Sequence, residues 1–220
     1  MVIRTAFAAA IFDLDGTLFD SMHVWDDVDH AFLRSRGLPE EPDYFEALKQ
    51  INIRECADYT IARYHLNETP EALIEWWNQK AAEAYRFDVQ VKPGAKEYLL
   101  TLKKSGIKLG IATSCSKELY EPALERLGIS HLFDAVTLTH EVGCNKSKPD
   151  VYLLTAEKLG VLPKDCIVFE DIPDAVNGAK LAGMTVVGVY DDTSKDHRAA
   201  IEKAADFYIE SFTELLEESK

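Results

Sequence analysis

Two carboxylates stand two residues apart where a short apolar run of this chain ends. The run covers residues 8–12 (AAAIF), and Asp13 and Asp15 follow it before a turn at Gly16 and Thr17. A short apolar run beside a turn signal is typical of a buried parallel strand. A carboxylate is poorly tolerated inside such a strand unless it is paired or binds a metal. We therefore expect both side chains at the rim of a sheet, where α/β proteins bind ligands.

Three further polar clusters follow apolar runs later in the chain. A single strand-end pair would be weak support for a site, since Asp residues there often cap the next helix. The clusters are Thr113 and Ser114 after residues 108–112, residues 146–150 (KSKPD) after 135–139, and Glu170 and Asp171 after 166–169. Helical patterns separate these runs, which predicts a parallel sheet with right-handed crossovers. Parallel strands end on one edge, so we expect all four clusters to converge.

The fold class that this pattern predicts is α/β, with a Rossmann-like parallel sheet and helices on both faces. This core takes residues 1–20 and 89–220, with strands near 107–113, 135–139, 166–170, 185–190 and 206–209. Residues 21–88 carry only helical patterns and are predicted to form an inserted helical cap, which could move over the site as a lid. Ser21 and Thr69 are predicted helix caps, and residues 211–218 a last helix.

The composition of the chain argues against some classes of binding partner. The formal net charge of −14 over 220 residues argues against nucleic acid and anionic membranes, which need a basic surface. No run approaches transmembrane length, and residues 1–12 favour a strand over a signal peptide because no cleavage-like site follows them. Four widely spaced cysteines favour reduced thiols and a cytoplasmic protein. We expect a monomer or weak dimer.

The converging residues are suited to phosphoryl transfer. Asp13 can attack phosphorus and form an aspartyl-phosphate. Asp15 can protonate the leaving oxygen and later take a proton from water. Thr113 and the backbone N–H of Ser114 can donate to phosphoryl oxygens, and Lys146 can stabilise the negative charge of the transition state.

Two acidic residues complete the predicted site. Glu170 and Asp171 would repel Asp13 unless a cation lay between them, and hard oxygen ligands shared with a phosphate favour Mg²⁺. Structural alternatives exist for each cluster: Thr113 as a helix N-cap, Lys146 as a solvated loop lysine, and the acidic pair as a cap of the next helix. The ordered set of four favours the site over these alternatives.

The set resembles the motifs of the haloacid dehalogenase superfamily of phosphohydrolases, over essentially the whole chain. The hallmark DxDGT corresponds to residues 13–17, the strand ending in Thr to 110–113, the lysine motif to 145–150, and the acidic motif to 168–171, followed by Ala-Gly-Met at 182–184. The resemblance implies that Asp13, the backbone carbonyl of Asp15 and Asp171 hold Mg²⁺, with Glu170 close by. The helical insert resembles the C1 cap of subfamily IA, the phosphoglycolate-phosphatase-like and β-phosphoglucomutase-like branch.

The function that this resemblance implies is a Mg²⁺-dependent phosphatase of small phosphorylated metabolites. The alternatives are a β-phosphoglucomutase-like sugar-phosphate mutase and a non-catalytic binding protein of the same fold. Trp25 and Gln50 occupy positions where those mutases carry His and Gly, which counts against a mutase. The intact Asp15 and Lys146 count against a loss of catalysis.

Departures from the lysine motif put only its loop shape in question. Asn145 and Ser147 replace the usual Gly and Pro. In the insert, the basic candidates for substrate recognition are Lys49, Arg54 and Lys80, each of which is also typical of a solvated helix surface.

Overall fold

The computed structural model of this chain describes residues 7–48 and 53–216. It separates into two compact units, which we name the sheet unit (Met1–Ser21 and Gln90–Lys220) and the helical unit (Met22–Val89). The predicted cap, residues 21–88, differs from the helical unit by one residue at each end. Its status as a separate cap domain stays a prediction.

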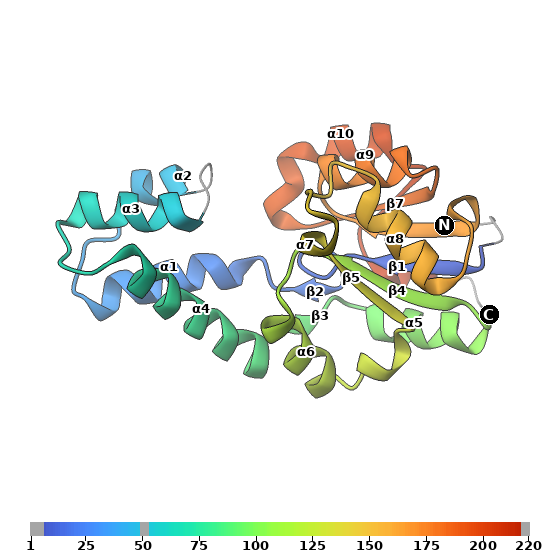
Figure 1. Cartoon of the computed structure of the whole chain (residues 1–220), viewed down its shortest axis with the longest axis horizontal. Coiled ribbons are helices and arrows are strands. Elements are labelled where there is room, and N and C mark those ends of the chain that lie inside the picture. The colour runs from blue at the N-terminus through green and yellow to red at the C-terminus, as the bar shows by residue number, and fades with distance from the viewer. Residues whose placement is uncertain (1–6, 49–52, 217–220) are drawn as a thin grey trace. The chain divides into compact units, whose positions relative to one another are not determined.

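Within the described part of the chain, the sheet unit is built on six parallel strands in the order β5-β4-β1-β6-β7-β8 (Figure 1). The strands are β1 (Ala9–Phe12), β4 (Lys108–Thr113), β5 (Ala135–Leu138), β6 (Cys166–Glu170), β7 (Thr185–Val189) and β8 (Phe207–Ile209). The order reverses at β1, the first strand of the chain, with β4 on one side and β6 on the other. Such a reversal leaves a crevice at the carboxyl ends of the strands, where open α/β sheets bind ligands. The predicted α/β fold is confirmed.

Helices cover both faces of this sheet. In Figure 1, α5 (Ala95–Lys104) and α6 (Lys117–Arg126) lie on one face, and α8 (Asp150–Leu159), α9 (Pro173–Leu181) and α10 (Arg198–Ala204) lie on the other. Their apolar sides close over strands that are buried on both faces, which explains why the strand sequences are continuous apolar runs.

The central strand β1 shows this two-sided burial. Ile11 belongs to an apolar cluster with Val151 and Val176 from the helices of one face. The ring of Phe12 stacks on that of Phe169, with centroids 4.6 Å apart. Every residue of β1 is buried, so the first polar side chain after it emerges at the edge of the sheet.

The two linkers between the units pair with each other. β2 (Phe19–Asp20) and β3 (Gln90–Val91) form a two-stranded antiparallel sheet that the sequence did not predict. Directly after β3, Lys92 Nζ donates to the Asp191 carboxylate at 2.8 Å and to the Tyr190 carbonyl at 2.6 Å. These contacts tie the returning linker to the segment that follows β7.

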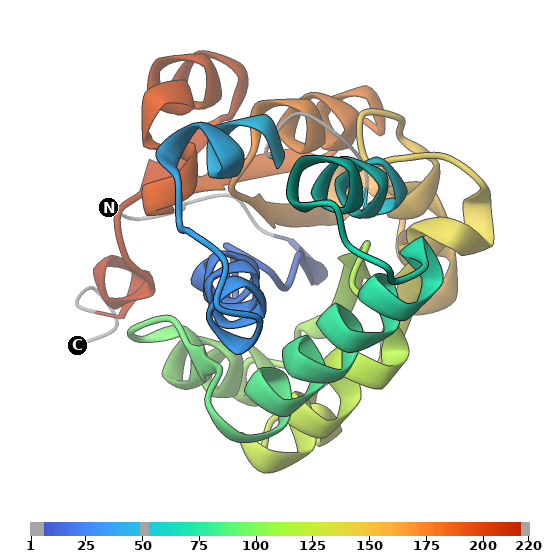
Figure 2. The same cartoon turned by 90° about the vertical axis from the view of Figure 1, so that its left-hand side faces the viewer.

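The described residues of the helical unit form four helices. They are α1 (His23–Ser35), α2 (Pro42–Leu48), α3 (Ile53–Tyr64) and α4 (Pro70–Phe87). α4 packs against both α1 and α3 (Figure 2), and Trp77 of α4 meets Phe32 of α1 edge-on, with ring centroids 5.5 Å apart. Thr69 caps α4 as predicted, its hydroxyl accepting from the Ala72 N–H. No helix among the described residues is long and apolar enough to cross a membrane.

Two predicted helix boundaries are wrong. Ser21 does not cap α1, whose N-cap is Met22; its hydroxyl donates instead to the Asp15 carboxylate. The predicted last helix, residues 211–218, is a 3-10 turn over Phe212–Leu215, and residues 217–220 lie outside the described part of the chain. Ser211 and Glu214 form a capping box at the start of this 3-10 turn. The ring of Phe212, the first residue of the turn, is buried against the ring of Phe12.

Candidate active site

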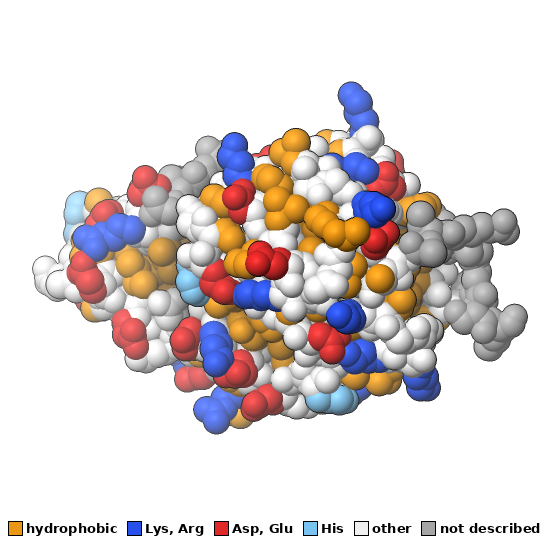
Figure 3. Space-filling model, turned by 45° about the vertical axis from the view of Figure 1, so that its right-hand side comes forward, with side chains coloured by type: hydrophobic (Ala, Val, Ile, Leu, Met, Phe, Trp, Pro, Cys, Tyr) orange, Lys and Arg blue, Asp and Glu red, His pale blue; other side chains and the backbone are white. Residues whose placement is uncertain are grey.

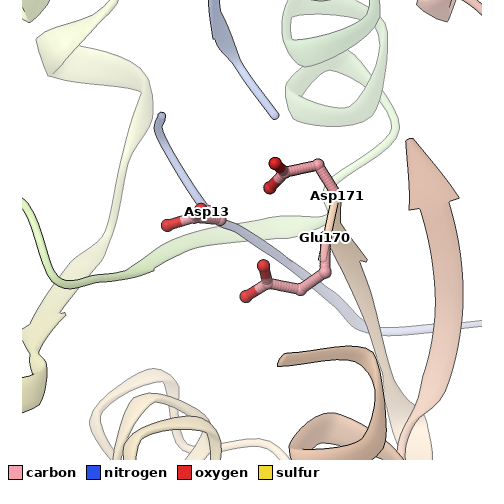
Figure 4. A group of neighbouring side chains, drawn as sticks. All are labelled: Asp13, Glu170 and Asp171. Atoms are coloured by element: carbon pink, nitrogen blue, oxygen red, sulfur yellow. The ribbon is translucent and has the colours of Figure 1, made fainter. Parts of the chain in front are cut away.

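Three carboxylates gather where β1 and β6 end. Asp13 follows β1, Glu170 is the last residue of β6, and Asp171 comes next (Figure 4). β1 and β6 are hydrogen-bonded neighbours, and the Asp13 N–H donates to the Phe169 carbonyl at 3.2 Å. All three carboxylates are buried, and one oxygen atom from each lies within 4.8 Å of the others. The sheet register therefore builds an acidic cluster from two segments 157 residues apart in the sequence, 170 minus 13.

Lys146 lies inside this acidic cluster. Its Nζ is 2.7 Å from Asp13 Oδ1 and 2.7 Å from Glu170 Oε1, and the residue is only 7% exposed. The alternative of a solvated loop lysine is therefore wrong. Charge-assisted hydrogen bonds are about twice as strong as neutral ones, and they fix the ammonium group between the two carboxylates.

The cluster carries more negative than positive charge. Three carboxylates and one ammonium leave two negative charges when all are ionised. Burial raises the pKa of Asp171 to about 7, and the neighbouring Asp13 adds to this rise. Burial also raises the pKa of Glu170 well above its usual range, with Asp13 and Asp171 acting in the same direction against Lys146. Burial alone would lower the pKa of Lys146, but Asp13 and Glu170 raise it above its usual value.

A divalent cation fits this cluster. The excess of two negative charges matches its charge, and carboxylate oxygens are the ligands that hard cations prefer. Glu170 Oε2 is buried without a hydrogen-bond partner among the described residues, and a buried polar atom of this kind needs a partner. The donor set and this unsatisfied oxygen are both consistent with a metal site.

The loop that carries Lys146 is held by contacts that the sequence did not reveal. Asn145 Oδ1 accepts from the Ser147 N–H at 3.2 Å and from its hydroxyl at 2.6 Å, so the two departures from the family motif form a local turn together. The loop also rests on Gly178 of α9. A Cβ atom at Gly178 would lie 2.0 Å from the Lys146 carbonyl oxygen, so no larger residue fits there. In the sequence, this close contact could have been inferred only from the presence of a glycine inside an otherwise regular helical pattern.

Gly16 and Thr17 of the first turn hold Asp171. Thr17 Oγ1 donates to Asp171 Oδ1 at 2.9 Å, and both residues are buried. Gly16 has a φ of +78°, and a Cβ atom there would lie 2.3 Å from Asp171 Oδ2. The turn therefore requires glycine for its backbone conformation and for its close approach to the carboxylate.

Asp15 lies on the same turn, at the outer side of the cluster. Its side chain is half-buried, and one carboxylate oxygen accepts from Ser21 Oγ at 2.6 Å. The Ser21 hydroxyl, predicted to cap a helix, therefore holds the Asp15 carboxylate instead. The proton-transfer role of Asp15 stays a prediction.

Thr113 and Ser114 end β4, the strand next to β1. Thr113 is buried and its Oγ1 accepts from the Cys115 N–H at 3.1 Å, whereas Ser114 is exposed. Thr113 is not a helix N-cap, since Ser116 occupies that position before α6. Ile172 is the N-cap of α9, so the acidic pair before it is not a cap either. Both alternatives are wrong, while the predicted phosphate contacts remain predictions.

The candidate recognition residues of the helical unit lie in surface ion pairs where they are described. Arg54 contacts Glu71 at 2.5 Å, and Lys80 contacts Glu83 at 2.6 Å. Trp25 of α1 is 37% exposed. Lys49 and Gln50 lie outside the described residues.

Comparisons with known proteins agree with this geometry. A model of the haloacid dehalogenase-like hydrolases matches residues 10–189. The "Phosphorylated carbohydrates phosphatase" of Thermotoga maritima is 27% identical over 90% of this chain and 91% of its own. The "Validoxylamine A 7'-phosphate phosphatase" of Streptomyces hygroscopicus subsp. limoneus is 30% identical over 95% of this chain and 96% of its own.

The fold of this chain is also similar to that of a solved structure. The β-phosphoglucomutase of Clostridium difficile superposes with a TM-score of 0.70 at 26% identity, covering 95% of this chain and 93% of that one. Residues 10–189, which the family model matches, contain all four polar clusters and both linkers. This chain belongs to the haloacid dehalogenase-like hydrolases.

Proposed function

We propose that this protein is a Mg²⁺-dependent phosphatase that hydrolyses phosphate monoesters of sugars and other small metabolites. The observation that carries the proposal is the buried Lys146 ammonium, bonded to both Asp13 and Glu170 beside Asp171. This arrangement offers a nucleophile, a fixed positive charge and a place for a cation at one point. The names of the two phosphatase relatives support the reaction and the sugar-like substrates.

In the first half of the reaction, a carboxylate oxygen of Asp13 attacks phosphorus. The new bond joins this oxygen to phosphorus, and the bond from phosphorus to the substrate's alcohol oxygen breaks. Asp15 gives its proton to the departing oxygen, which leaves as the alcohol. Lys146 stabilises the charge on the phosphoryl oxygens, and Thr113 and the Ser114 N–H donate to them.

In the second half, water attacks the aspartyl-phosphate. Asp15, now ionised, takes a proton from this water as its oxygen binds phosphorus. The bond between phosphorus and Asp13 breaks, which restores the carboxylate and releases inorganic phosphate.

A divalent cation would be held by Asp13, Asp171, the backbone carbonyl of Asp15 and Glu170. When bound, it compensates the negative charge that three carboxylates and a phosphate dianion bring together. Mg²⁺ suits this set because it accepts few carboxylates and shares its remaining positions with phosphate oxygens and water.

Chelation tests the metal. After exhaustive treatment with EDTA, phosphate release from a panel of sugar phosphates should fall to background, and added Mg²⁺ should restore it. Full activity of the EDTA-treated protein would contradict the metal site. Absence of phosphate release from the whole panel with Mg²⁺ present would favour the non-catalytic alternative.

A sugar-phosphate mutase is the second candidate, favoured by the similarity to the β-phosphoglucomutase structure. A mutase must protect its phospho-Asp13 from water until a sugar phosphate binds. Trp25 stands where mutases of the family carry a His, so we expect hydrolysis. Phosphorus NMR on β-glucose 1-phosphate with a trace of the 1,6-bisphosphate separates the two. Glucose 6-phosphate that accumulates faster than inorganic phosphate would establish the mutase.

One face of the surface carries charged side chains of both signs. On the face shown in Figure 3, Lys and Arg side chains alternate with Asp and Glu, and no broad basic patch is seen there. Four further points stay predictions: that the helical unit acts as a lid, that the protein is a monomer or weak dimer, that it is cytoplasmic, and that it does not bind nucleic acid.

A further inference from the structure

The hydroxyl of Tyr152 lies beside the acidic cluster, and none of the sequence motifs accounts for it. Tyr152 stands in the first turn of α8 and is fully buried. Its hydroxyl is 2.8 Å from Glu170 Oε1 and 3.1 Å from the Ala175 carbonyl oxygen, to either of which it can donate. A tyrosine hydroxyl has one proton to donate, and two acceptors from β6 and α9 flank it here. The hydroxyl is therefore fixed relative to both elements.

The two oxygens of the Glu170 carboxylate have different surroundings. Oε1 accepts from Lys146 Nζ at 2.7 Å and from the Tyr152 hydroxyl. Oε2 is buried and has no hydrogen-bond partner among the described residues. Protein donors thus hold the carboxylate through one oxygen and leave the other available. A carboxylate held in this way cannot turn without losing its bonds.

The second donor matters because Lys146 serves several acceptors. Its ammonium is already shared between Asp13 and Glu170, and in the proposed reaction it also meets phosphoryl oxygens. A lysine side chain is flexible, whereas a buried tyrosine has only two side-chain torsions and a rigid ring. The bond from Tyr152 therefore persists while Lys146 changes partners.

Building on the proposed metal site, we propose that Tyr152 is a positioning residue that fixes Glu170 with Oε2 turned toward the divalent cation. Groups that orient a metal ligand commonly change metal affinity about 10- to 100-fold when they are removed. The hydroxyl of Tyr152 contacts Glu170 and the Ala175 carbonyl, and Tyr152 is not one of the residues proposed to hold the phosphate or the metal. Its effect is therefore expected on metal binding and not on the chemical step.

The test compares Tyr152→Phe with Tyr44→Phe. Tyr44 is the matched control, because it is equally buried and its hydroxyl also has a partner, Thr60 Oγ1 at 3.0 Å, within the helical unit. Titration calorimetry with Mg²⁺, without substrate, should show Kd about tenfold weaker in Tyr152→Phe and unchanged in Tyr44→Phe. The Mg²⁺ concentration for half-maximal activity should rise in parallel, while kcat at saturating Mg²⁺ stays near that of the wild type.

The possible outcomes separate this inference from the proposed function. An unchanged Kd in Tyr152→Phe, with normal Mg²⁺ binding by the wild type, overturns the positioning role alone. A lower kcat at every Mg²⁺ concentration with unchanged Kd shows a general structural role and also overturns it. A wild-type protein that binds no Mg²⁺ overturns the metal site and the inference together.

Discussion

The sheet unit contains a buried cluster of charged side chains, whereas the ion pairs described in the helical unit lie at or near its surface. In the sheet unit, Asp13, Lys146, Glu170 and Asp171 are all buried at one edge of the sheet. In the helical unit, ion pairs such as Lys80 with Glu83 lie at the surface, and aromatic rings such as Trp77 fill the interior. Buried ion pairs contribute little net stability because desolvation offsets their attraction.

The two units differ in the free-energy cost of the charged groups that they bury. Burial raises the pKa of both Glu170 and Asp171, so keeping this cluster fully ionised without a cation costs stability. The surface pairs of the helical unit carry no such cost. Asp29 is the exception there, since burial and the neighbouring Asp26 raise its pKa to about 7.

The largest expected effect comes from the buried cluster. Asp13→Asn should reduce phosphate release by more than about 1,000-fold, because a neutral amide cannot attack phosphorus. Asp20→Asn, which changes an exposed aspartate of β2, is the control and should retain activity. Activity of Asp13→Asn within about tenfold of the wild type would remove Asp13 from the nucleophile role.

A smaller effect is expected where the sheet unit supports the lysine loop. Gly178→Ala should lower kcat by about 100-fold, because its Cβ would displace the Lys146 carbonyl and with it the ammonium. Asn177→Ala, exposed on the same helix, should leave kcat unchanged. Equal activity of the two variants in steady-state assays would show that the loop position does not matter.

The helical unit offers a test at Asp29, a half-buried carboxylate of α1. The pKa of Asp29 is 3.8 in its usual environment and about 7 here, so between these values the folded state binds a proton that the unfolded state has released. Stability should therefore fall as pH rises from about 4 to about 7, by up to about 1.4 kcal/mol per pH unit from this group. Asp29→Asn should remove this part of the slope.

Tryptophan fluorescence during urea unfolding suits this measurement. All three tryptophans, Trp25, Trp76 and Trp77, belong to the helical unit, so their emission reports on that unit alone. His30, Tyr44 and Cys56 also interact with Asp29, and subtracting the variant's profile from that of the wild type isolates Asp29. Identical slopes for both proteins would contradict the raised pKa.

The smallest effect is expected at the helical surface. Lys80→Ala removes an ion pair whose side chains are 41% and 60% exposed, and stability should change by no more than about 0.5 kcal/mol. Urea unfolding followed by the same fluorescence measures this change. A loss above about 2 kcal/mol would show that the surface pairs stabilise this unit as strongly as buried contacts do.

The sequence predicted the fold and the convergence of the polar clusters because both follow from local patterns. Apolar runs followed by Asp13 or Glu170 identify strand ends, and parallel topology then brings those ends to one edge. The roles of Tyr152, Gly178 and Ser21 were missed because they arise from contacts between distant segments. A buried tyrosine or a glycine within a helix has the same local sequence pattern whatever segment packs against it.

The pairing of β2 with β3 has a consequence for how such a protein can be rebuilt. Phe19 lies opposite Val91 and Asp20 opposite Gln90, so the insert leaves and rejoins the sheet unit at adjacent points. A two-residue hairpin turn can connect strands in this arrangement. We therefore expect that a designed protein could carry a short turn or another insert in place of the helical unit. The two ends of the sheet unit would not have to move apart or come closer to accept it. The contacts of Lys92 to the segment after β7 would remain to anchor the new junction.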